Sequence, residues 1–106
     1  MTAHWWSLIL AGFLEIAWAA AFKHAFKEND WLTAATVAAM AGSFYFLWIA
    51  MRAIPIGTAY AVWTGIGAIG AVLVGIVAYG EPATAIRLIC ITLILAGIVG
   101  LKLAAP

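Results

Sequence analysis

Residues 56–79 read IGTAYAVWTGIGAIGAVLVGIVAY and contain no charged side chain. The run is longer than the about 20 helical residues that cross a hydrocarbon core of roughly 30 Å. Its apolar residues follow one another without alternating polar ones, which favours a helix over a strand of a membrane barrel. Because a chain in lipid must satisfy its own backbone hydrogen bonds, we expect residues 56–79 to form a membrane-spanning helix.

Three further apolar runs have the same character and cover about residues 5–22, 31–51 and 86–103. The whole chain is 68% hydrophobic and only 8% charged, whereas a typical soluble domain is roughly 25% charged. Too few charges are present to coat a water-facing surface, so we expect the apolar residues to face lipid. The sequence therefore predicts an all-α integral membrane protein with four transmembrane helices, in which residues 1–106 form a single domain.

The composition also argues against several function classes. The formal net charge of +1 does not supply the clustered basic face of a nucleic-acid-binding protein. Cys90 stands alone inside an apolar run, so no disulfide framework is expected. The sequence contains no recognisable cluster of metal ligands, nucleophile–base pair or phosphate-binding loop. We therefore expect no catalytic residue, no metal site and no cofactor.

Glu15 is the one charged residue within residues 5–22. An acid at mid-helix depth costs about 2.5–3.5 kcal/mol or more on insertion scales, and such residues mostly face a cavity or a proton pathway. Gly12 and Trp18 share its helical face at spacings of three residues. We therefore expect Glu15 to bind a cation or a proton, with Gly12 as secondary lining. The alternative is a protonated structural acid held by hydrogen bonds.

Tyr60, Trp63 and Gly67 fall on one face of the helix expected over residues 56–79. Aromatic faces attract organic cations by about 0.5–2 kcal/mol each, and the N–H and O–H groups of such residues can hold a carboxylate. An interfacial aromatic belt is the alternative. It suits tryptophans at helix ends better than Trp63, which lies well inside its run. The neighbouring glycines are more typical of packing or kink positions than of ligands.

The second run offers Ser43 as its deepest polar group, with Met40 and Phe44 near it as possible secondary lining. A lone serine in such a helix is often a packing hydroxyl that bonds to its own backbone, so both interpretations stay open.

The fourth run places Ala96 and Gly100 four residues apart with Gly97 beside them. Small residues at this spacing let two helices approach closely. We therefore predict a contact seam there, either between helices of one chain or between two subunits.

The basic residues hardly distinguish the two sides of a four-span protein. Arg52 and Lys102 would lie on one side, and Lys23, Lys27 and Arg87 on the other. Orientation in the membrane follows the asymmetry of Lys and Arg. Two residues against three leave both a fixed topology and insertion of copies both ways up as possible outcomes.

These features resemble those of the small multidrug resistance family of bacterial exporters. The resemblance covers essentially the whole chain and rests on four short spans, the membrane-embedded Glu15, and residues 57–65 (GTAYAVWTG). Three further stretches resemble the guanidinium-exporter branch: residues 13–19 (FLEIAWA), 63–68 (WTGIGA) and 97–102 (GIVGLK). The branch that exports polyaromatic drugs usually has a small residue where Trp18 stands. Trp48 departs from the pattern we expect of the second helix.

The resemblance implies an antiparallel, dual-topology homodimer in the bacterial inner membrane. It implies a proton-coupled antiporter in which guanidinium and protons compete for the Glu15 carboxylates of the two copies. It also implies binding-site roles for Ser43 and Trp63, which would donate hydrogen bonds to the carboxylate and orient it. Trp18 and Tyr60 would line and close the pocket.

Other functions remain open at this point. A quaternary ammonium or multidrug exporter of the same family is the first alternative, although Trp18 argues against bulky substrates. A channel or uniporter would conduct without exchanging protons. A non-transporting membrane subunit would tolerate Glu15→Ala.

Overall fold

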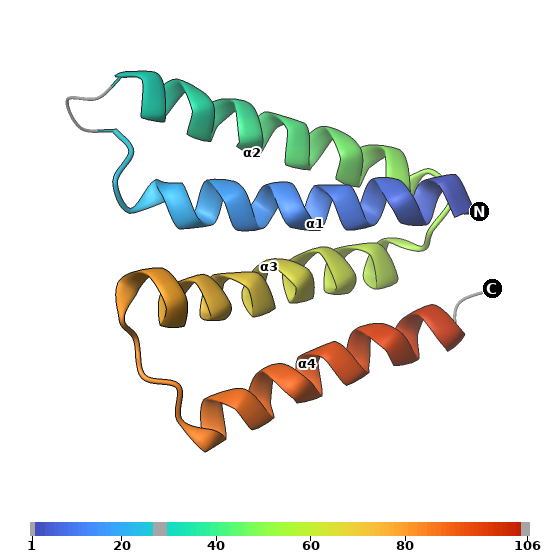
Figure 1. Ribbon diagram of the computed structural model, residues 1–106. Coiled ribbons are helices and arrows are strands. Elements are labelled where there is room, and N and C mark those ends of the chain that lie inside the picture. Colours follow the sequence, from blue (N-terminus) through green and yellow to red (C-terminus); the bar gives the residue numbers. More distant parts are fainter. Residues whose placement is uncertain (1, 27–29, 105–106) are drawn as a thin grey trace.

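The computed structural model describes residues 2–26 and 30–104. Within this part of the chain lie four α-helices: α1 (Thr2–Phe22), α2 (Asp30–Met51), α3 (Ile56–Tyr79) and α4 (Ala85–Ala104) (Figure 1). Each is long and apolar enough to cross a membrane. The expected all-helical architecture with four spans is confirmed. The first helix begins at Thr2 and not near Trp5, where the apolar run begins, because the helical backbone extends beyond the apolar residues.

Local residues set the ends of α3 and the start of α4. Pro55 precedes α3, and its fixed φ and missing N–H suit a position where a helix begins. Gly80 ends α3 in the left-handed conformation with φ of 67°, which costs glycine little because it lacks a Cβ atom. Thr84 caps α4, since its Oγ1 atom accepts a hydrogen bond from the backbone N–H of Arg87 at 3.3 Å.

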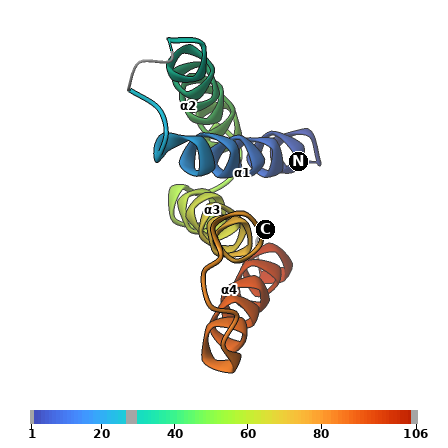
Figure 2. The same ribbon diagram turned by 60° about the vertical axis from the view of Figure 1, so that its left-hand side comes forward.

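The helices lie in the order α2, α1, α3, α4 (Figures 1 and 2). α1 packs between α2 and α3, whereas α4 packs mainly against α3 and also reaches α1, where the ammonium of Lys102 lies 5.1 Å from the centroid of the Trp5 ring. The described ends of the chain lie near the α2–α3 connection, at the same end of the molecule. The molecule measures 46 × 34 × 17 Å, and a helix with side chains is about 10–12 Å wide. One copy is therefore a thin layer of helices rather than a closed bundle.

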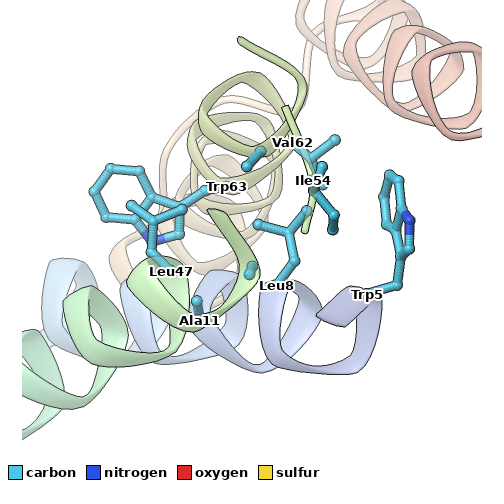
Figure 3. Packing of buried hydrophobic residues seen from close by; sticks show 9 residues of the cluster. Trp5, Leu8, Ala11, Leu47, Ile54, Val62 and Trp63 are labelled. Carbon is cyan, nitrogen blue, oxygen red and sulfur yellow. The ribbon is translucent and has the colours of Figure 1, made fainter. Parts of the chain in front are cut away.

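The buried core lies toward the end of the molecule that holds the α2–α3 connection (Figure 3). Its residues come from α1, α2, α3 and that connection, and α4 contributes no buried residue. The core comprises Trp5, Leu8, Ala11, Leu47, Ala50, Ile54, Ala59, Val62 and Trp63. This packing fixes α1, α2 and the first half of α3 against one another, and α4 adds the partly buried Ile98 and Leu101.

Glycines bring α1 and α3 into close contact. A Cβ atom added to Gly12 would lie 2.7 Å from the Cγ2 atom of Ile66, and one added to Gly70 would overlap the side chain of Ile16. Each glycine therefore makes room for an isoleucine of the facing helix. Gly12, expected as secondary lining of the site, is buried against Ile66; its lining role stays a prediction.

Candidate functional site

Glu15 lies half-buried in the middle of α1 and faces α3. A Cβ atom at Gly67 of α3 would lie 2.5 Å from the carboxylate carbon of Glu15, so only glycine at this position leaves room for the carboxylate as it stands. The Oε1 atom of Glu15 is buried and accepts no hydrogen bond from the described residues. A buried polar atom without a partner is costly and points to a role beyond packing.

Trp18 follows Glu15 one helical turn later and is partly buried. Its ring packs edge-on against Phe22, with 6.0 Å between the ring centroids. Its Nε1 atom is also buried and finds no acceptor within residues 2–26 and 30–104. α1 therefore holds a buried acceptor and a buried donor one turn apart, neither of which is paired within the described residues.

Two buried hydrogen bonds join α1, α2 and α3 beside this position. The hydroxyl of Ser43 donates to the carbonyl oxygen of Ala11 at 2.7 Å. The indole N–H of Trp63 donates to the Oγ atom of Ser43 at 2.9 Å. Ala11 lies one turn before Glu15 in α1. The junction therefore fixes the helical turn from which Glu15 projects.

This arrangement differs from the direct hydrogen bonds to Glu15 that the resemblance implies. Ser43 has one O–H and Trp63 has one indole N–H. The first is directed at a backbone carbonyl and the second at Ser43, so neither hydrogen is available to the carboxylate. In this structure Trp63 bonds to Ser43, and Ser43 bonds to the backbone of α1 one turn before Glu15. Their place in the binding site stays a prediction.

Trp63 also supports two aromatic rings at the surface. The ring centroids of Trp63 and Tyr60 are 5.5 Å apart, and those of Trp63 and Phe44 are 5.7 Å apart. Trp63 itself is buried, whereas Tyr60 is 54% exposed and Phe44 48% exposed. Met40 lies partly buried one turn before Phe44. The rings form an accessible aromatic surface across α2 and α3, anchored at the Ser43 junction.

The small residues of α4 lie at the surface of the described part of the chain. Ala96, Gly97 and Gly100 are exposed, and a Cβ atom added to either glycine would meet nothing within 4 Å. The contact between α3 and α4 lies elsewhere, where Gly65 packs under Ile98. Of the two alternatives that the sequence leaves open for this seam, packing between helices of one chain is not the one that the structure shows.

The sequence profile described as small multidrug resistance protein matches residues 3–94. This chain belongs to the small multidrug resistance family. It is 50% identical to a guanidinium exporter of Yersinia pseudotuberculosis over 105 residues, which cover 95% of this chain and 98% of the relative. It is 51% identical to a guanidinium exporter of Citrobacter freundii over 104 residues, which cover 94% of this chain and 96% of the relative.

Membership of the small multidrug resistance family settles the general class of the protein. The family consists of exporters, and the chain has four helices able to span a membrane within its described residues. The protein is therefore a multi-pass transporter of the bacterial inner membrane and not an enzyme.

Tyr79 makes an interhelical contact in this transporter that sequence reasoning did not find. Its hydroxyl donates to the carbonyl oxygen of Ala20 at 2.6 Å, which ties the end of α3 to the end of α1. The ammonium of Lys23 lies 4.8 Å from the centroid of the Tyr79 ring. The two bonded residues are 59 positions apart. A tyrosine at a helix end suggests only an interfacial anchor, so no pattern in the sequence reveals this partner.

Proposed function

We propose that the protein exports guanidinium or small guanidinyl cations in exchange for protons, and that Glu15 binds both. The observation that carries this proposal is the buried Oε1 atom of Glu15, which has no partner in the described part of the chain. Guanidinium is planar and permanently charged, and its forked N–H donors match the two oxygens of a carboxylate. The names of the relatives support this choice of cation.

Coupling would arise from competition at the same carboxylate. A protonated Glu15 lacks the charge that holds a cation, and a bound cation excludes the proton. When two Glu15 carboxylates face one cavity, their protonation is coupled and belongs to the pair. Binding of substrate on one side of the membrane would then release protons there, and the reverse exchange would follow on the other side.

The proposed site needs a second copy of the chain. One copy is a layer 17 Å thick, which is too thin to enclose a solute between its own helices. α4 leaves Ala96, Gly97 and Gly100 uncovered, and these residues suit a helix–helix contact with another subunit. The near-equal basic residues of the two sides allow the copies to insert in opposite orientations. We therefore infer an antiparallel, dual-topology homodimer that alternates between two equivalent states.

The remaining residues would shape the pocket. Trp18 would line it and offer its unused N–H. Tyr60 would close it, since its ring is exposed and lies against Trp63. Ser43 and Trp63 would hold the turn of α1 in place, and Met40 and Phe44 would complete the apolar wall.

Transport currents on proteoliposomes, recorded by solid-supported-membrane electrophysiology, test the proposal. We expect a current on perfusion of guanidinium, a smaller one for a small quaternary ammonium ion and none for a bulky aromatic cation. Glu15→Gln should abolish all of them. A current dominated by bulky cations would instead indicate a multidrug exporter. A guanidinium current that survives in Glu15→Gln would contradict the role of this residue. A one-for-one exchange of guanidinium and protons carries no net charge, so a protein that gives neither a current nor uptake of radiolabelled guanidinium would be a non-transporting subunit.

A further inference from the structure

A second aromatic surface lies on α2, near the end of the helix at Met51 and outside the residues assigned to the candidate site. Trp48 is 57% exposed. The guanidinium carbon of Arg52 lies 5.2 Å from the centroid of the Trp48 ring, which is within the range of a cation–π contact. Tyr45 lies next to Trp48, with 6.3 Å between the ring centroids and 34° between the ring planes.

The ring of Trp48 holds Arg52 without the help of an anion. In the described part of the chain the one recorded ion pair joins Glu81 to Arg87, and Arg52 takes no part in it. Arg52 itself is exposed. Its side chain ends in a guanidinium group, the same chemical group as the proposed substrate. The structure therefore displays a planar guanidinium cation seated on Trp48, although this one is tethered to the chain.

Trp48 lies nearer the Met51 end of α2 than Phe44 and Ser43 of the candidate site. It lies one turn before the end of α2, which corresponds to the interfacial depth that tryptophan prefers. Phe44 lies one turn further into the helix on the same face, and its ring packs against Trp63. Aromatic side chains thus extend from the end of α2 to the anchor of the candidate site.

We propose that Trp48 is an outer docking site for guanidinium-type cations, and that Arg52 competes with the substrate for the same ring. The identity of the cation rests on the proposed function. A free guanidinium ion would displace the tethered one and be held beside the aromatic surface that leads to Trp63. A compact and strongly hydrated cation such as Na⁺ would gain much less there, because it keeps its water shell.

The docking site can be tested without transport, in full-length Glu15→Gln protein that carries 5-fluorotryptophan in lipid nanodiscs. The ¹⁹F resonance of Trp48 is assigned by Trp48→Phe, and guanidinium chloride is titrated against NaCl at equal concentration. We expect guanidinium, but not Na⁺, to shift the Trp48 resonance. Arg52→Gln should tighten this apparent binding about two- to fivefold, the range of an exposed cation–π contact.

Trp31 provides the internal control, since it is 68% exposed at the opposite end of α2. Equal shifts of the Trp31 and Trp48 resonances would overturn the proposal, because guanidinium would then bind any exposed indole. A Trp48 resonance that guanidinium does not shift would also overturn the proposal and leave Trp48 as an interfacial anchor. So would an apparent affinity that Arg52→Gln does not change.

A double-mutant cycle on the transporting protein separates the ring contact from simple charge. We expect Trp48→Leu to raise the KM for guanidinium about two- to fivefold and Arg52→Gln to lower it by a similar factor. Arg52→Gln should have no effect once Trp48 is leucine. An equal effect in both backgrounds would mean that Arg52 only repels cations, which contradicts the proposal. If no variant transports guanidinium, the proposed function fails, whereas the ¹⁹F titration still decides whether Trp48 binds the cation.

Discussion

At the scale of single residues, the contact between Glu15 and Gly67 is the tightest constraint on the candidate site. Any side chain at position 67 must displace the carboxylate, since its Cβ atom would lie 2.5 Å from the carboxylate carbon. The carboxylate is the mobile end of a flexible side chain, so the fold can absorb the change by moving it. Cation binding at the carboxylate, however, depends on where the carboxylate lies, so the same movement would disturb it.

We therefore expect Gly67→Ala to fold and to lose guanidinium transport by roughly tenfold or more, which corresponds to about 1.4 kcal/mol. Gly57→Ala is the matched control on the same helix, because an added Cβ atom there meets nothing within 4 Å. Initial rates of guanidinium uptake into proteoliposomes measure the difference. Equal rates for the two variants would show that the contact with Glu15 does not matter.

Ser43 is the second residue whose environment yields a prediction. Ser43→Ala removes the acceptor of the Trp63 N–H and the hydroxyl that bonds to Ala11. A buried donor left without a partner costs about 1–3 kcal/mol, so we expect that loss in the free energy of unfolding. Thr92→Ala on α4 is the control, since its exposed hydroxyl bonds only to its own helix. Unfolding of the purified variants in SDS–detergent mixtures measures the free energy that each substitution costs. Equal costs for Ser43→Ala and Thr92→Ala would show that the hydrogen bonds of Ser43 do not stabilise the fold.

The sequence singles out the candidate residues of this site, but it does not reveal the hydrogen bonds that Ser43 and Trp63 make. Glu15, Ser43 and Trp63 stand out because a charge, a hydroxyl and an indole are rare inside apolar helices. Where the hydroxyl of Ser43 points depends on how closely α1 and α2 approach at Ala11, and no periodicity encodes that distance.

At the scale of elements, α4 differs from the other three helices because none of its residues is buried. Its seam of Ala96, Gly97 and Gly100 faces away from the chain, so a bulky residue there leaves the single copy undisturbed. The same residue would separate two subunits packed along the seam.

We expect Gly97→Leu to preserve the helical content of the chain and to shift the protein from dimer to monomer. Leu95→Phe is the control, since helical spacing places it on the side of α4 away from the seam. Single-molecule photobleaching in liposomes counts the subunits, and circular dichroism reports the helices. A dimer that survives Gly97→Leu at the same protein density would place the interface elsewhere.

Most helix boundaries followed from the sequence because residues such as Pro55, Gly80 and Thr84 act on the backbone beside them, although α1 begins at Thr2 instead of near Trp5. The order in which the helices pack did not follow from the sequence. Each helix is apolar on all sides, so hydrophobic periodicity does not distinguish a face that packs on another helix from one that faces lipid. That α4 buries none of its residues could be found only from the structure.

At the scale of the whole molecule, the proposed dimer depends on insertion in both orientations. Arg52→Gln with Lys102→Gln leaves Lys and Arg only on the other side. Lys23→Gln with Lys27→Gln and Arg87→Gln does the reverse. Because orientation follows Lys and Arg, we expect each variant to insert one way and to export little guanidinium alone. Their coexpression should restore export. Full export by either variant alone would contradict an antiparallel dimer.

The most direct test of the central claim is radiolabelled guanidinium uptake into proteoliposomes under an imposed pH gradient. With an acidic lumen, protons leave as guanidinium enters, so we expect guanidinium to accumulate against its own gradient. A protonophore should abolish this accumulation, and Glu15→Gln should lack it at every pH. Uptake that does not depend on the pH gradient, or that persists in Glu15→Gln, would contradict exchange of protons and guanidinium at this carboxylate.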